Sequence, residues 1–95
     1  MLTQKQISDV ISKVASQYPI RRIFLFGSYA TGTNTPNSDV DLLVEFDTES
    51  VSLLTISSLK NNIEEMLSLP VDVIRAPIPE GSLIKPEKMI QIYGE

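Results

Sequence analysis

The sequence contains neither cysteine nor histidine. Without cysteine it can form no disulfide framework, no thiolate metal site and no cysteine nucleophile. Without histidine it has no histidine general base and no imidazole metal ligand, so the histidine-based catalytic triads are excluded. Carboxylates are therefore the only good metal ligands that the chain can offer.

Long apolar runs and long basic runs are also missing. No apolar run approaches the ~20 residues of a membrane span, and the N-terminus lacks a secretory signal pattern, so we expect a cytoplasmic protein with no membrane partner. Twelve acidic residues exceed eight basic ones, which gives a formal net charge of −4. Because a polyanion would be repelled on average, direct nucleic-acid binding is disfavoured.

Hydrophobic spacing predicts a single α/β domain over residues 1–95, with helices packed on one small sheet in the order α-β-α-β-α-β. The expected elements are a helix from the capping box at Thr3 to about Gln17, a strand at about 22–26, a short helix at 28–31, a strand at about 39–46, a helix after Ser52 that ends before Pro70, and a strand at 71–74. The third helix is expected to be apolar at Leu53, Ile56, Leu59, Ile63, Met66 and Leu67. The tail at 89–93 alternates as an edge strand would, and a short helix opening at 86–88 is the competing interpretation.

The centre of the chain is Gly27-Ser28, followed after ten residues by Asp39-Val40-Asp41. An apolar run that ends in glycine is typical of a buried strand stopping at a tight turn. Glycine allows the backbone to approach a ligand closely, and Ser28 is a candidate N-cap for the short helix. A helix start carries unpaired N–H groups and suits a phosphate. We therefore expect Gly27 and Ser28 to bind nucleotide phosphates.

Three aspartates are candidate metal ligands. Asp39 and Asp41 lie two apart on one strand and so project from the same face, with Cα atoms roughly 7 Å apart. Asp72 lies between two valines on the next strand. If that strand neighbours the strand of Asp39 and Asp41, Asp72 can lie beside these two aspartates. Three carboxylates there could hold two Mg²⁺ ions about 3.5–4 Å apart, an arrangement that supports in-line phosphoryl displacement.

Each of these features by itself has an ordinary structural explanation. A lone D-x-D at a strand start is usually a pair of solvated acids, and a lone Gly-Ser is a common turn. Four fixed positions, however, occur together by chance in about 10⁻³ of chains of this size. The combination favours a site for a metal–nucleotide complex.

Residues 26–32 (FGSYATG) and 38–44 (SDVDLLV) resemble the GSx10DxD signature of the polymerase-β-like nucleotidyltransferase superfamily, and most closely its minimal nucleotidyltransferases, the MNT or MntA-like antitoxins. The similarity covers essentially the full chain. It implies a mixed sheet, phosphate contacts at Gly27 and Ser28, and Mg²⁺ ligands at Asp39, Asp41 and Asp72. It further implies AMP transfer from ATP to a hydroxyl of a partner protein, with the chain acting as the antitoxin of a HEPN-domain toxin.

One position departs from the family pattern, which usually reads G-S-x-A-R-G. Thr31 stands where the arginine would be, and its hydroxyl cannot bind a phosphate bidentately as a guanidinium does. The loss could weaken nucleotide binding by about 1.5–3 kcal/mol if the contact is charge-assisted. Arg75, Arg21 and Arg22 are candidates to compensate for it.

Two other functions compete with AMP transfer to a partner protein. The chain could be a weak or inactive enzyme that neutralises a HEPN toxin by binding alone, which agrees with Thr31, the acidic balance and the small size. It could also modify a small molecule or RNA, although relatives of that kind carry an added substrate-binding domain.

Overall fold

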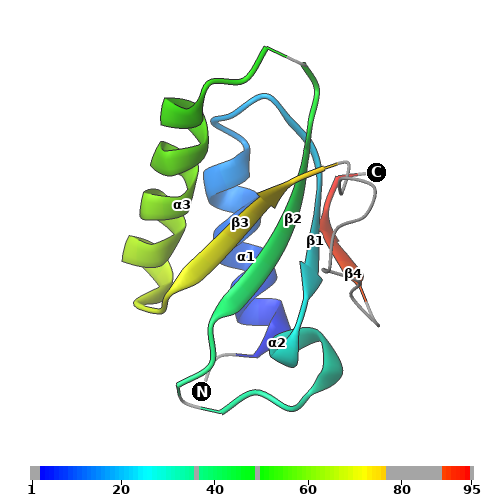
Figure 1. The fold of residues 1–95 in the computed structure, drawn as a ribbon. Helices are drawn as coiled ribbons and strands as arrows, with labels where there is room; N and C mark the ends of the chain where they lie inside the picture. The colour runs from blue at the N-terminus through cyan, green and yellow to red at the C-terminus, as the bar shows by residue number, and fades with distance from the viewer. Residues whose placement is uncertain (1–2, 36, 49, 77–88, 95) are drawn as a thin grey trace, which may run out of the picture.

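In the residues that the computed structural model describes (3–35, 37–48, 50–76 and 89–94), one four-stranded sheet is covered by two long helices (Figure 1). The elements are α1 (Gln4–Ala15), β1 (Ile20–Phe26), α2 (Ser28–Thr31), β2 (Val40–Phe46), α3 (Leu53–Leu67), β3 (Val71–Arg75) and β4 (Ile90–Tyr93). The strand order is β3-β2-β1-β4. The predicted single sheet with packed helices is confirmed.

The sheet is mixed because its connections differ. β1 pairs antiparallel with β2 and with β4, whereas β2 and β3 are parallel. A parallel pair needs a crossover, and α3 supplies it by returning the chain from the end of β2 to the start of β3. The first residues of β2 and β3 therefore lie side by side.

α1 begins as the sequence predicts, with a capping box. The Thr3 side chain accepts a hydrogen bond from the Gln6 backbone N–H at 3.1 Å, and the Gln6 side chain accepts one from the Thr3 N–H at 2.8 Å. The helix ends at Ala15, two residues before the expected end. β1 starts at Ile20 rather than at residue 22, because Ile20 pairs with Phe46 across the sheet.

α3 is capped by Ser52, as expected, but its predicted apolar face is wrong at two positions. The buried residues are Leu59, Ile63 and Leu67, one helical stripe that faces the core. Leu53 is 81% exposed, because the first turn of the helix lies beyond its buried stripe, and Met66 is 48% exposed because it lies beside that stripe.

The C-terminal segment resolves the choice between strand and helix. β4 is an edge strand that pairs with β1, and the Ser8 hydroxyl of α1 donates a hydrogen bond to the Ile92 carbonyl at 3.1 Å. The tail therefore packs on the sheet of its own domain. The possible helical turn at 86–88 lies outside the described residues.

α1 and α3 lie on the same face of the sheet (Figure 1). The core between them and the sheet includes alternate residues of three strands: Ile23, Leu25, Val40, Leu42, Val44 and Val71. Because side chains alternate along a strand, Asp41 and Asp72 face away from this core. Among the described helices, none combines the length and apolar character that crossing a membrane requires.

Candidate functional site

The turn after β1 is built on a glycine with a positive φ. Gly27 has φ 75°, and its carbonyl accepts hydrogen bonds from the backbone N–H groups of Ala30 and Thr31 at 3.0 and 3.1 Å. Gly27 is thus the N-cap of α2 and Ser28 is its first residue, so the prediction that Ser28 caps this helix is wrong. Gly32 closes the helix as its C-cap in the left-handed conformation.

Gly27 lies directly against the carboxyl group of Asp41. A Cβ atom at Gly27 would overlap Asp41 Oδ2 and would lie 3.1 Å from Asp41 Cγ. This contact follows from the antiparallel register, in which Phe26 is the partner of Asp41. Only glycine combines this backbone conformation with so close an approach.

Asp41 also faces a second carboxylate. In the parallel register it is the direct partner of Asp72, so the two carboxyl groups lie on the same side of neighbouring strands. Partial burial is the main cause that raises the pKa of Asp41 above its ordinary value, and the negative charges of Asp72 and Asp39 raise it further. The structure therefore brings Asp41 and Asp72 together and leaves Asp39, just before β2, close enough for its charge to act on Asp41.

The carboxylate oxygens of Asp39, Asp41 and Asp72 are suitable ligands for a hard cation such as Mg²⁺. Mg²⁺ prefers oxygen ligands and commonly takes only one or two protein carboxylates, with water and substrate phosphates completing its shell. A cation beside Asp41 would relieve the repulsion that raises its pKa. Among the described residues, no three acidic side chains are gathered closely enough to hold a metal ion by themselves. The side chains present thus fit a cation that is completed by phosphate oxygens.

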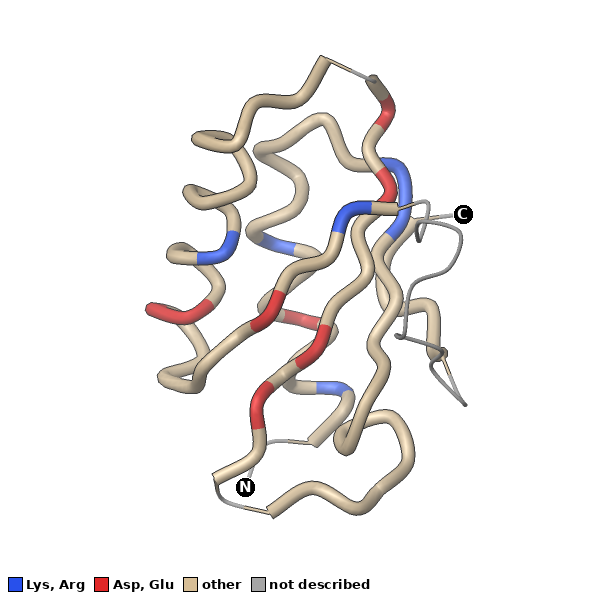
Figure 2. Tube along the Cα trace, viewed as in Figure 1, with Lys and Arg blue, Asp and Glu red and all other residues tan. Residues whose placement is uncertain are grey.

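An open pocket of about 470 Å³ adjoins the two carboxylates. Its described lining residues are Phe26, Asp41, Lys60, Asp72, Val73 and Ile74. Acidic residues lie on the halves of β2 and β3 nearer α2 (Figure 2). Sequence reasoning missed Lys60, since helical periodicity places it on the flank of α3 but does not indicate which strand that flank follows.

Thr31 does not leave its hydroxyl free for a ligand. Its Oγ1 lies 2.9 Å from Thr33 Oγ1, and it donates to the carbonyls of Gly27 and Ser28 over longer distances of 3.3 and 3.4 Å. These contacts stay within the turn around α2. The hydroxyl thus stabilises the local loop in the place where the family pattern has a cation.

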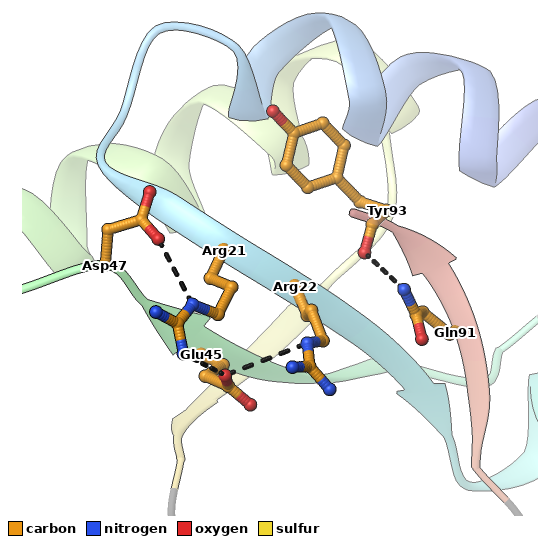
Figure 3. A network of polar contacts seen from close by, with 6 residues as sticks. All are labelled: Arg21, Arg22, Glu45, Asp47, Gln91 and Tyr93. Carbon is orange, nitrogen blue, oxygen red and sulfur yellow. Dashed lines mark hydrogen bonds and ion pairs between the residues drawn. The ribbon is translucent and has the colours of Figure 1, made fainter. Parts of the chain in front are cut away.

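Arg21 and Arg22 do not replace the missing arginine. Both contact Glu45 Oε1, at 3.6 and 3.8 Å, and Arg21 also reaches Asp47 Oδ1 at 3.4 Å (Figure 3). They lie at the start of β1, roughly 16–20 Å along the strand from Gly27. Their predicted compensating role is not supported, because their charges are already paired far from the turn.

Comparison with known proteins gives consistent matches. The family model described as "Nucleotidyltransferase domain" matches residues 7–95. Protein adenylyltransferase MntA of Thermococcus cleftensis is 36% identical over 78 residues, which cover 78% of each chain.

Solved structures show the same fold. A toxin–antitoxin crystal structure with AMP-PNP contains a chain that superposes with a TM-score of 0.78 at 24% identity, covering 93% of this chain and 73% of that one. A complex of a tri-AMPylated Shewanella oneidensis HEPN toxin with its MNT antitoxin matches with a TM-score of 0.73 at 20% identity, over 98% and 74% of the two chains. At these identities the likeness confirms the fold alone.

Proposed function

The chain belongs to the nucleotidyltransferase domain family, and from this premise we propose that it transfers AMP from ATP to a hydroxyl group of a partner protein in a Mg²⁺-dependent reaction. The observation that carries the proposal is the contact of Asp41 with both Gly27 and Asp72. It joins a turn that can accept phosphate to a pair of carboxylates that can accept a cation. Residues 1–95 act in this proposal as a single domain.

Each group has a defined task in the proposed reaction. Gly27 and Ser28 bind the phosphates, and Asp39, Asp41 and Asp72 hold Mg²⁺. The bound cation would neutralise charge on the phosphates and favour in-line displacement. The acceptor hydroxyl oxygen forms a bond to the α-phosphorus, the bond from that phosphorus to the bridging oxygen breaks, and pyrophosphate leaves. The hydroxyl proton passes to Asp72, which is exposed at the pocket.

The proposed partner is a HEPN-domain toxin, with this chain as its antitoxin. Support comes from the relative named as protein adenylyltransferase MntA and from structural neighbours that are antitoxins in complexes with their toxins. The protein acceptor also agrees with the net charge of −4, which disfavours a nucleic-acid substrate.

The test is transfer of label from α-labelled ATP. The protein is incubated with labelled ATP, Mg²⁺ and the protein that the adjacent gene encodes. We expect label on that partner, loss of labelling on removing Mg²⁺, and loss with Asp39→Asn. Asp9→Asn, an exposed aspartate on α1, is the matched control and should label normally. An unlabelled partner with the active, Mg²⁺-loaded protein would contradict the proposal.

Thr31 favours a second candidate function, in which the chain neutralises its toxin by binding without modifying it. Because the Thr31 hydroxyl bonds within its own loop, no side chain at this position contributes a positive charge to the nucleotide. Under this alternative the partner stays unlabelled in a tight and inhibited complex. Asp41→Asn would then neutralise the toxin as well as the unmodified protein does.

A further inference from the structure

Lys60 belongs to the flank of α3 that runs along the edge strand β3. The buried stripe of this helix includes Leu59 and Ile63. Lys60 directly follows Leu59 and so lies beside this stripe. One helical turn further along the same flank, Glu64 Oε2 accepts a hydrogen bond from the backbone N–H of Val71 at 3.0 Å. This hydrogen bond fixes the flank against the outer side of β3.

Lys60 also lines the pocket that contains Asp41 and Asp72. It is half-buried, and it is the only basic side chain among the described lining residues. The ion pairs found in the described part of the chain involve Arg21 and Arg22 and leave Lys60 out. The positively charged Lys60 side chain therefore lies at a pocket whose other charged side chains are negative. It forms no direct ion pair with Asp41 or Asp72.

The strand order places Lys60 on one particular side of this site. Moving across the sheet, Gly27 follows β1, Asp41 lies on β2 and Asp72 lies on the edge strand β3, and Lys60 lines the same pocket from the flank of α3 along that edge. In an in-line displacement the attacking oxygen enters opposite to the leaving group. If the phosphates bind at the Gly27 turn, the acceptor hydroxyl approaches from the side of Asp72 and Lys60.

We propose that Lys60 is a specificity residue for the acceptor and that it binds an anionic group, a carboxylate or a phosphate, which the acceptor chain carries next to its reactive hydroxyl. This inference rests on the proposed AMP transfer. An acidic acceptor approaching three aspartates would be repelled, and Lys60 offsets that repulsion at the point of entry. The apolar lining of Phe26, Val73 and Ile74 receives the uncharged part of the acceptor side chain.

The first test compares synthetic peptides that contain one tyrosine flanked by glutamates, by phosphoserine or by lysines. The wild type should have a kcat/KM about fivefold higher for the acidic peptides than for the lysine peptide, in line with one partly exposed ion pair. Glutamate and phosphoserine peptides distinguish the two anion sources. Lys60→Glu should reverse the preference, Lys60→Arg should keep it, and the KM for ATP should stay unchanged in both variants.

Lys13→Glu is the control for altered net charge, because Lys13 is an exposed lysine on α1 and outside this pocket. It should keep the wild-type preference. A Lys60→Glu variant that loses activity equally with all peptides and shows a raised KM for ATP would overturn the proposal, because Lys60 would then contact the nucleotide.

A binding measurement separates this inference from the proposed function. Anisotropy of the same fluorescently labelled peptides, without ATP, should show tighter binding of the acidic peptides to the wild type and the reverse for Lys60→Glu. If the wild type transfers no AMP but this reversal is seen, the proposed function fails and the role of Lys60 in binding stands. Equal binding of all peptides by both proteins would refute the role of Lys60 whether or not AMP is transferred.

Discussion

Asp41 on β2 is the direct register partner of Asp72 on β3, and the negative charge of Asp72 helps to raise the pKa of Asp41. Two negative carboxylates side by side on neighbouring strands repel each other and destabilise the folded protein, unless a proton or a cation lies between them. The most important pair of the candidate site is therefore also a local source of instability, which gives it measurable consequences without any knowledge of the substrate.

The stability of the protein should depend on the protonation of Asp41. Because its folded-state pKa is raised above the unfolded value, its contribution to stability is fully present below the unfolded pKa and is lost as pH rises through the folded pKa. Asp41→Asn should thus raise Tm by about 2–4 °C at pH 7 and leave it unchanged near pH 3.5. Thermal melts from pH 3.5 to 8 test this, with Asp9→Asn as control; an equal gain at both pH values would count against it.

Mg²⁺ should stabilise the folded protein through the same carboxylates. At a free concentration tenfold above its Kd, one bound ion adds about 1.4 kcal/mol to the free energy of unfolding. Thermal melts with Mg²⁺ and with EDTA should show this gain in the wild type and its loss in Asp72→Asn. An undiminished gain in Asp72→Asn would place the ion elsewhere.

Gly27→Ala should abolish AMP transfer, because the added Cβ would overlap the Asp41 carboxylate. Gly32→Ala is the control for alanine at a positive φ: its φ is 78°, and nothing lies within 4 Å of its Cβ position. Gly32→Ala should cost about 1 kcal/mol of stability because alanine is strained in the left-handed region, and Gly27→Ala should cost more because its backbone conformation is nearly confined to glycine. Only Gly27→Ala should lose nucleotide binding, measured by titration with a fluorescent ATP analogue. Equal loss in both variants would show that backbone strain, and not the Asp41 contact, is responsible.

Thr31→Arg should strengthen ATP binding by about tenfold, because a guanidinium can pair with phosphate where the hydroxyl now bonds within its own loop. Thr33→Arg adds the same charge two residues further along and should change the Kd much less. Isothermal titration of both variants with Mg-ATP measures the difference. Similar gains in the two would indicate a general effect of charge.

Leu59→Ala and Leu53→Ala should differ sharply in stability although both residues lie on α3. Leu59 is fully buried, so its truncation should cost about 2–5 kcal/mol, whereas Leu53 is 81% exposed and its truncation should cost less than about 0.5 kcal/mol. Urea unfolding of the two variants provides the comparison. A cost above about 1 kcal/mol for Leu53→Ala would contradict the exposed position of the first turn of α3.

Local signals in the sequence determined most of the elements of the fold. The capping box at Thr3, the cap at Ser52 and the apolar run before Gly27 depend on neighbours a few residues away, so they can be recognised without coordinates. The start of β1 at Ile20, and the exposure of Leu53 and Met66, depended on the packing of distant residues. Periodicity gives the stripe of a helix but not how much of its length the sheet covers.

For the candidate site, the sequence by itself determined which residue types are present. It showed aspartates as candidate metal ligands, a glycine turn before them, and a threonine where the family pattern has an arginine. Only the tertiary structure decided that Asp72 lies beside Asp41, that Gly27 touches the carboxylate, and that Lys60 faces the same pocket. The three residues that meet Asp41 or Asp72 here come from positions 12 to 31 residues away in the chain. Which strands become neighbours is set by the crossover of α3 and by core packing, and neither leaves a local pattern in the chain.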